Sequence, residues 1–131
     1  MEEITVKTNS KIEMIDITRQ VHDIVQQSKV THGICIVFVP HTTAAITINE
    51  NADPAVLKDI ITELNKIIPL QDNYRHMEGN SAAHIKATLT GSSQTVIIEN
   101  GELRLGTWQS LFFCEYDGPR NRKAWVKIIS S

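Results

Sequence analysis

Short hydrophobic runs with the spacing of β-strands recur along most of the chain. Near the start, two alternating runs on either side of Asn9-Ser10 predict two strands joined by a turn. A pair of alternating runs around Asn100-Gly101 predicts a hairpin with a type I′ turn. The predicted strands lie at residues 3–9, 11–17, 33–40, 44–50 and 94–99, with further strands within 102–108 and 109–130. The run 33–40 is apolar at almost every position and predicts a strand buried on both faces.

Three other segments have the 3.6-residue spacing or the end signals of helices. Residues 16–28 can form a helix capped by Asp16 or Thr18. The clearest helix covers 53–68, where Asp53 caps, Pro54 opens the first turn and seven aliphatic residues form one stripe. A third covers 81–89 and ends at Gly91. We therefore predict a single α+β domain over residues 1–131, with a mostly antiparallel sheet and two to three helices.

Composition and charge exclude several classes of protein. The 131 residues are 41% hydrophobic and 21% charged, and the formal net charge of -2 gives no basic field for nucleic acid or an anionic membrane. The acidic N-terminus is unlike a secretory signal, and no apolar run reaches the roughly 20 residues of a transmembrane helix. Cys35 and Cys114 lie in apolar runs without metal-ligand spacing, which favours buried, reduced thiols. A cytoplasmic location is expected.

Polar residues gather at four places that interrupt apolar elements, at 40–44, 49–53, 73–91 and 115–122. His76 and His84 would be about 12 Å apart on one continuous helix. The break at Gly79-Asn80 instead lets His76 fold back from a loop toward His84. His41 would complete a three-histidine site with an open position, which is typical of catalytic zinc. The alternative is that these are unrelated surface histidines.

Other polar residues also allow a structural and a functional interpretation. Asp53 has the position of a helix cap, whereas Glu50 has no obvious structural role and could act as a general base. Arg120 and Arg122 could clamp a phosphate or lie in solvent on a turn. Trp108 is either a core residue or a platform for substrate. Gln109, next to it, has either a structural or a functional role.

Long segments of the chain resemble the YjbQ family. The resemblance is carried by residues 41–54 ("HTTAAITINENADP"), 74–93 ("YRHMEGNSAAHIKATLTGSS") and 101–122 ("GELRLGTWQSLFFCEYDGPRNR"), in that order. It implies an α+β fold that assembles as a homotrimer, with the sheets packed around the threefold axis. It also implies that the polar residues at the element ends form one site.

The resemblance further implies roles for individual residues. It points to catalytic residues Glu50, Asp53 and Glu115, and to a divalent metal, with zinc favoured over magnesium or manganese, on His41, His76 and His84. It implies a substrate site made of Thr42, Asn51, Asn80, Trp108, Gln109, Arg120 and Arg122. Relatives without the "DGPR" sequence make Arg120 the weakest of these assignments.

Three functions follow as alternatives. Members of the family resemble secondary thiamine-phosphate synthases, which join a pyrimidine diphosphate to a thiazole phosphate and expel diphosphate. The leading expectation is thus a small metal-assisted enzyme acting on a phosphorylated metabolite, including weak activity of this kind. Dedicated enzymes for this reaction are (β/α)₈ barrels of about 250 residues, so the activity would have arisen here on another scaffold. The alternatives are a metal-dependent hydrolase and a non-catalytic trimer that binds a metabolite or metal.

Overall fold

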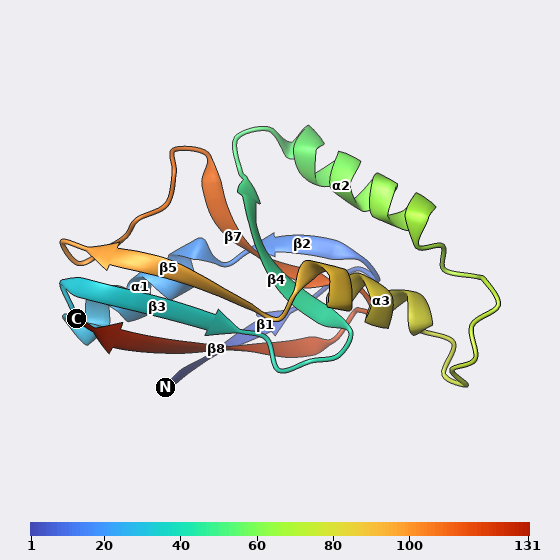
Figure 1. Ribbon diagram of the computed structural model, residues 1–131, viewed down its shortest axis with the longest axis horizontal. Coiled ribbons are helices and arrows are strands. Elements are labelled where there is room, and N and C mark those ends of the chain that lie inside the picture. Colours follow the sequence, from blue (N-terminus) through green and yellow to red (C-terminus); the bar gives the residue numbers. More distant parts are fainter.

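The computed structural model describes all residues 1–131 as one α+β domain (Figure 1). Three helices and eight strands follow one another along the chain. In order, they are β1 (Glu2–Lys7), β2 (Glu13–Asp16), α1 (Thr18–Ser28), β3 (His32–Phe38), β4 (Ala44–Glu50), α2 (Pro54–Ile67), α3 (Ser81–Thr90), β5 (Ser93–Glu99), β6 (Glu102–Leu103), β7 (Gln109–Glu115) and β8 (Asn121–Ser130). None of the helices is long and apolar enough to cross a membrane.

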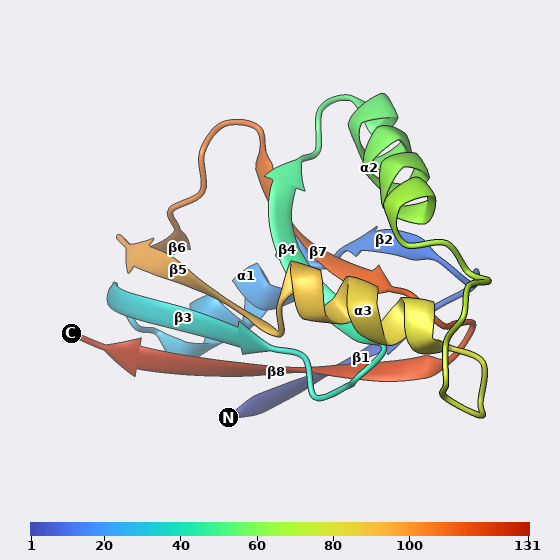
Figure 2. The ribbon, with the colours of Figure 1, turned by 45° about the vertical axis from the view of Figure 1, so that its right-hand side comes forward.

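The strands form two antiparallel sheets (Figures 1 and 2). Sheet A has the order β1-β8-β3-β5-β6, and sheet B has the order β2-β7-β4. Strands that follow one another in the chain often belong to different sheets. For example, β1 pairs with β8 in sheet A, whereas β2 pairs with β7 in sheet B. The chain therefore crosses between the sheets at the β1–β2 and β7–β8 turns, and these two turns lie at the same end of the molecule.

The main core lies between the two sheets and α1. Val21 and Val25 of α1 pack with inward-facing residues of sheet A, such as Val37, and of sheet B, such as Phe113. A second, smaller core covers the other face of sheet B, where Ala83 and Ala87 of α3 meet Cys114 and Tyr116. Both faces of β7 are thus buried, which explains its continuous run of apolar residues.

Most of the predicted elements are confirmed, but β3 is less buried than predicted. The β3 strand is buried on one face only, since Ile34 and Ile36 are half-buried and Phe38 is 41% exposed. The α2 helix begins at Pro54 as predicted, with the Asp53 side chain accepting a hydrogen bond from the Ala55 N–H, but none of its residues is fully buried. The outer face of β3 and the stripe of α2 are apolar faces that the rest of this chain covers only in part.

Candidate functional site

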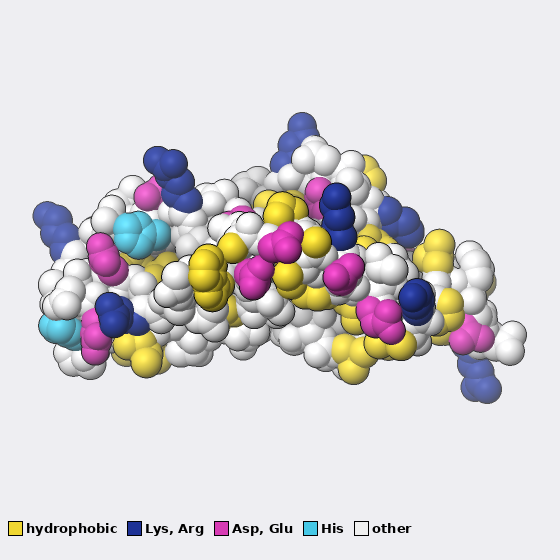
Figure 3. Space-filling view, turned by 90° about the horizontal axis from the view of Figure 1, so that it is seen from above, with side chains coloured by type: hydrophobic (Ala, Val, Ile, Leu, Met, Phe, Trp, Pro, Cys, Tyr) yellow, Lys and Arg dark blue, Asp and Glu magenta, His cyan; other side chains and the backbone are white.

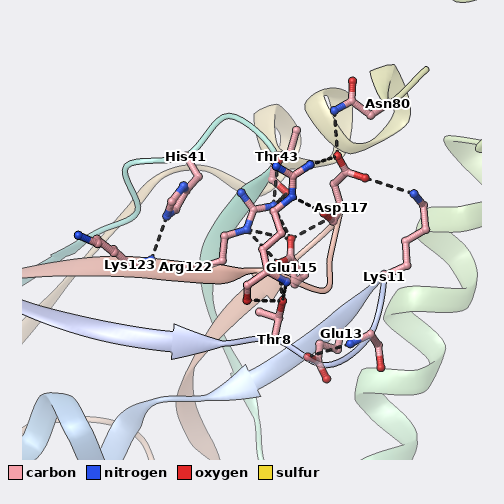
Figure 4. A network of polar contacts seen from close by, with 12 residues as sticks. Thr8, Lys11, Glu13, His41, Thr43, Asn80, Glu115, Asp117, Arg122 and Lys123 are labelled. Atoms are coloured by element: carbon pink, nitrogen blue, oxygen red, sulfur yellow. Dashed lines mark hydrogen bonds and ion pairs between the residues drawn. The ribbon is translucent and has the colours of Figure 1, made fainter. Parts of the chain in front are cut away.

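Polar side chains from four parts of the chain meet where the chain crosses between the sheets (Figure 4). We call this region the polar end. It contains Thr8 and Lys11 from the β1–β2 turn, His41 and Thr43 from the β3–β4 loop, Asn80 before α3, and Glu115, Asp117, Arg120 and Arg122 from the ends of β7 and β8 and the turn between them. Three of the four polar segments singled out in the sequence thus converge on one place.

A buried ion pair between Glu115 and Arg122 lies at the centre of the polar end. Glu115 is fully buried and Arg122 is 4% exposed. The Arg122 Nε donates to Glu115 Oε1 at 2.9 Å, and Nη2 donates to Glu115 Oε2 and to Thr43 Oγ1. Thr8 Oγ1 donates to Glu115 Oε1 at 2.7 Å, and the Asp117 N–H donates to Oε2 at 3.0 Å. Burial would raise the pKa of Glu115, but these donors outweigh it and hold the pKa below its ordinary value.

This pairing limits what the two residues can do in catalysis or binding. Both carboxylate oxygens of Glu115 are already bonded, so the group predicted to transfer protons is instead held ionised inside the protein. The hydrogen bonds of Arg122 run through Nε and Nη2, which leaves Nη1 as the guanidinium nitrogen available to a ligand. Breaking such a pair by removing one partner costs about 3–5 kcal/mol, so the pair also holds β7 and β8 together.

Asp117 is a second hub of the polar end, and it was not identified in the sequence. Its Oδ1 accepts a hydrogen bond from Lys11 Nζ at 3.2 Å, and its Oδ2 accepts from Asn80 Nδ2 at 2.9 Å and Arg120 Nη2 at 2.8 Å. Burial acts to raise the pKa of Asp117, but the Asn80 and Lys11 hydrogen bonds prevail and lower it. Asn80 precedes the first turn of α3, yet its side chain makes no capping bond, and its buried Oδ1 has no partner.

His41 is held in one tautomer by the backbone of β8. Its Nε2 accepts the Lys123 N–H at 2.9 Å, so in the neutral ring the proton resides on Nδ1. Burial, with the charge of Arg122 adding to it, lowers the pKa of His41 and favours this neutral form. With Nε2 occupied and Nδ1 protonated, His41 has no lone pair for a metal. It does have an N–H that can donate to a ligand.

His76 and His84 do come together, as the break at Gly79-Asn80 predicted. Their ring centroids are 5.3 Å apart with the rings nearly perpendicular. Nevertheless, the chain contains no group of three or more histidine, cysteine or acidic side chains arranged to hold a metal. The predicted three-histidine site is therefore not formed within one chain. Two imidazoles alone fall short of the three protein ligands typical of catalytic zinc.

Most of the remaining predicted site residues lie at the opposite end of sheet B. The strand register pairs Glu50 with Gln109 at one end of β4 and Ala44 with Glu115 at the other. Six residues separate these ends, and a rise of about 3.3 Å per residue gives a distance of roughly 20 Å. Asn51, Asp53 and Trp108 neighbour the Glu50 end, and Thr42 neighbours the polar end. The residues expected to form a single site thus fall into two separate groups within one chain.

At the Glu50 end the local contacts are mainly structural. The Asn51 N–H donates to the Trp108 carbonyl oxygen, and the Gln109 side chain accepts the Gly106 N–H at 2.8 Å. The Trp108 side chain is 62% exposed, which excludes the interpretation of Trp108 as a core residue.

Several residues of the polar end gave no usable signal in the sequence. Thr8 lies 107 positions from Glu115, and Thr43 lies 79 positions from Arg122. Lys11 and Asp117 occupy turns, where charged residues are common. Only the strand pairing, which brings the β1–β2 and β7–β8 turns together, shows that these residues belong to one network.

The chain is similar to known proteins over almost its whole length. The family model described as "UPF0047 protein YjbQ-like" matches residues 2–131. A UPF0047 protein of Methanocaldococcus jannaschii is 56% identical over 124 residues, which is 95% of this chain and 90% of that protein. The YugU protein of Bacillus subtilis is 50% identical over 127 residues, which is 96% of each chain.

Solved structures give the same answer at the level of the fold. The crystal structure of a YjbQ/UPF0047 protein from Clostridium acetobutylicum has a TM-score of 0.97 and 56% identity, over 98% of this chain and 100% of that chain. A protein of unknown function from Sulfolobus solfataricus has a TM-score of 0.95 and 37% identity, over 99% and 96% of the two chains. The sequence, the fold and the similarity over nearly the whole length lead to the same conclusion, that this chain belongs to the YjbQ (UPF0047) family.

Proposed function

We propose that the protein binds a small phosphorylated metabolite at its polar end and acts on it as an enzyme. The observation that carries the proposal is a polar cavity of about 220 Å³ beside the β7–β8 turn, lined by Lys7, Thr8, Pro119, Arg120 and Asn121. Two of its lining residues are cationic and none is acidic. Arginine and lysine without a carboxylate in the same cavity are suited to phosphate.

The charge balance around this cavity supports an anionic ligand. The chain as a whole has a net charge of -2. At the polar end, however, Lys11 and Arg120 share the single carboxylate of Asp117, while Arg122 is neutralised by Glu115. The positive N-terminal end of the α3 dipole lies beside Asn80 and adds to the local excess.

A phosphate titration tests the binding step. Inorganic phosphate, followed by isothermal titration calorimetry and amide chemical shifts, is expected to perturb residues 7–8 and 119–121. Arg120→Ala should weaken binding by about ten- to a hundredfold, the effect of losing one charge-assisted hydrogen bond of roughly 1.5–3 kcal/mol. Arg104→Ala is the matched control, because Arg104 is also exposed and also paired with an acidic residue. Equal affinity in the wild type and Arg120→Ala would contradict the proposal.

The reaction itself divides into two classes. Thiamine-phosphate synthesis, the most specific expectation from the sequence, joins a pyrimidine diphosphate to a thiazole phosphate and releases diphosphate. A hydrolase would release phosphate from one substrate alone. Incubation with both thiamine precursors, and separately with a simple phosphate ester, distinguishes the two by their products. Glu50 lies roughly 20 Å from the polar end of its own chain, so it can act on this substrate only from a neighbouring subunit. In that case Glu50→Gln, which retains the shape of the side chain, should lose activity and keep affinity, whereas a non-catalytic binder keeps its affinity and has no activity to lose.

A divalent metal, with zinc favoured, remains our proposal for His76 and His84. The 5.3 Å separation of their rings suits two ligands of one ion, and the remaining ligands would come from water, the substrate or a second subunit. Such a metal would neutralise charge on a departing phosphate group. Elemental mass spectrometry of the purified protein should find metal that is lost in His76→Ala and His84→Ala but retained in His32→Ala, where the histidine is exposed at the start of β3. A wild-type protein that contains no metal after incubation with zinc, manganese or magnesium would contradict the proposed metal site.

A homotrimer is the assembly we propose, on the basis of the outer face of sheet A. The register places Ile34 opposite both Ile97 and Ile129, so three isoleucines form one row across β5, β3 and β8. Ile97 is 58% and Ile129 46% exposed. Phe38 and Trp125 stack on the same face four residues further along β3, with ring centroids 5.9 Å apart. An exposed apolar face of this kind is typical of a subunit interface.

A further inference from the structure

An open polar cavity lies at the Glu50 end of sheet B, where the start of α1 meets the start of β7. Its volume is about 620 Å³, within the range of small-molecule sites. None of its lining residues is apolar, and most come from the start of α1 and the adjoining ends of β4 and β7. These are Thr18, Arg19, Gln20 and His22 of α1, Asn51 after β4, and Ser110 of β7.

Two hydrogen bonds hold the start of α1 against β7. The Ile17 N–H donates to the Leu111 carbonyl oxygen at 2.9 Å, and the Leu111 N–H donates to Thr18 Oγ1 at 2.8 Å. Ser110 is the neighbouring residue of β7, so it lies beside the first turn of α1. The two main walls of the cavity are therefore fixed relative to each other by contacts of the backbone.

The first turn of α1 has N–H donors without partners. Such donors find no acceptor within their own helix. Ile17, the residue before α1, supplies no side-chain cap, and the first turn contains no acidic residue. Asp16, which also lines the cavity, covers one donor only, because its Oδ1 accepts the Thr18 N–H at 2.9 Å. The N–H groups of Arg19 and Gln20 are left, and together with the helix dipole they favour an anion.

The Arg19 side chain adds a full positive charge to the cavity. Arg104, Arg120 and Arg122 are each paired with a carboxylate, whereas Arg19 forms no ion pair. An unpaired guanidinium offers the planar fork of donors that matches a phosphate group. The second carboxylate oxygen of Asp16 is an acceptor, which suits a ligand hydroxyl group.

Ser110 distinguishes this cavity from an ordinary helix start. It is 5% exposed, and its hydroxyl group makes no hydrogen bond within the chain. The only fully covered side-chain oxygen without a partner is Asn80 Oδ1, so the Ser110 hydroxyl keeps its access to the cavity that it lines. A hydroxyl group both donates and accepts, and it can therefore bond to a ligand hydroxyl or to a phosphate oxygen.

We propose that this cavity binds a small polyhydroxylated phosphate ester, such as a sugar phosphate. The phosphate group lies at the first turn of α1, on the N–H groups of Arg19 and Gln20 and on the Arg19 guanidinium. The hydroxyl groups bond to Ser110, to the Asn51 amide and to the second oxygen of Asp16. A ligand with an apolar ring would need apolar walls, and this cavity has none. The site shares no lining residue with the phosphate cavity at the polar end and is independent of it.

Ribose 5-phosphate is a suitable probe, compared with ribose and with inorganic phosphate by amide chemical shifts and calorimetry. It should shift the N–H signals of residues 18–20 and 110. It should bind there about tenfold or more tightly than ribose or inorganic phosphate, because only it has both kinds of group. Arg19→Ala should weaken its binding by about ten- to a hundredfold, as expected for a charge-assisted hydrogen bond, and Ser110→Ala by about two- to tenfold, as expected for a neutral one.

The matched controls Arg104→Ala and Ser93→Ala change exposed residues that line neither cavity, and they should leave the affinity unchanged. The proposal is overturned if ribose 5-phosphate binds at residues 18–20 and 110 no more tightly than inorganic phosphate, or if Arg19→Ala and Ser110→Ala bind it as the wild type does. Shifts confined to residues 7–8 and 119–121 would support the function proposed above and overturn this one. Shifts at residues 18–20 that disappear in Arg120→Ala would also overturn it, because they would then arise from the polar end.

Discussion

Two buried charged groups, Glu115 and Lys86, differ in how completely their hydrogen bonds are satisfied. Glu115 is surrounded by donors, and every one of its oxygens is bonded to Arg122, Thr8 or the Asp117 backbone. Lys86 has one amide oxygen and no acid. A fully satisfied ion pair holds strands in place, whereas a partly satisfied ammonium leaves much of the cost of its burial uncompensated. The contacts, and not burial alone, decide what a buried charge contributes to stability.

Lys86→Met should stabilise the folded protein at pH 7 by about 1–3 kcal/mol, because it removes a poorly compensated buried charge. The folded-state pKa of Lys86 lies below its unfolded value of 10.5, so the unfolded state binds more protons between the two values. Wild-type stability therefore rises with pH in that interval, and the advantage of Lys86→Met should shrink toward pH 10.5. Urea denaturation between pH 6 and 10.5 measures this.

The substitution Lys58→Met, on the exposed face of α2, is the control and should change stability by less than about 0.5 kcal/mol. If Lys86→Met instead lowers stability at pH 7, the ammonium serves chiefly as a tether between α2 and α3.

Among the elements, α2 is held least firmly. None of its residues is fully buried and Ile67 is 63% exposed, while β7 is buried on both faces. Local opening follows the number of buried contacts, so α2 should open without unfolding the sheets. The capping bond from Asp53 and the Lys86–Asn65 hydrogen bond are the contacts that define its two ends.

Two leucines on different elements test this difference with the same substitution. Leu57→Ala in α2, where the side chain is half-buried, should cost about 1 kcal/mol, whereas Leu111→Ala in β7, where it is fully buried, should cost about 2–5 kcal/mol. Native-state hydrogen exchange should also find less protection in α2 than in α3. Equal costs and equal protection would mean that α2 is part of the core.

At the scale of the whole molecule, the uncovered face of sheet A is the main unexplained surface. The face that Figure 3 shows carries interspersed acidic and basic side chains and no large field of one sign. The outer face of sheet A instead has a row of isoleucines and, further along β3, the Phe38–Trp125 stack. Its burial in an oligomer would also bring groups of one chain near those of another. The two ends of sheet B, roughly 20 Å apart in one chain, could then contribute to one site.

Ile97→Asp should dissociate the proposed homotrimer, because a carboxylate in the middle of the isoleucine row cannot be buried without a partner. Sedimentation velocity should give three chain masses for the wild type and one for the variant. Ile67→Asp provides the matched control, since Ile67 is 63% exposed at the end of α2, away from sheet A. A wild type that sediments as a monomer, or an Ile97→Asp variant that remains a trimer, would contradict the proposed assembly.

Much of the fold could be predicted from local patterns. Alternation and end signals identified the strands and all three helices, because backbone hydrogen bonding and burial of one face are decided over a few neighbouring residues. The turn at Asn100-Gly101 was predictable for the same reason, and both residues have positive φ values. The break at Gly79-Asn80 likewise predicted that His76 and His84 would meet.

The grouping of the functional residues was not decided locally. Nothing near Glu115 in the sequence indicates Thr8, and nothing near Lys86 indicates Asn65, because these contacts depend on which strands pair and where α2 lies. For the same reason the sequence placed Glu50 and His41 in one site, although β4 separates them. The sequence by itself determined the elements and the residues available for chemistry. Only the tertiary structure decided which of them share a site, because strand pairing joins segments that are far apart in the chain.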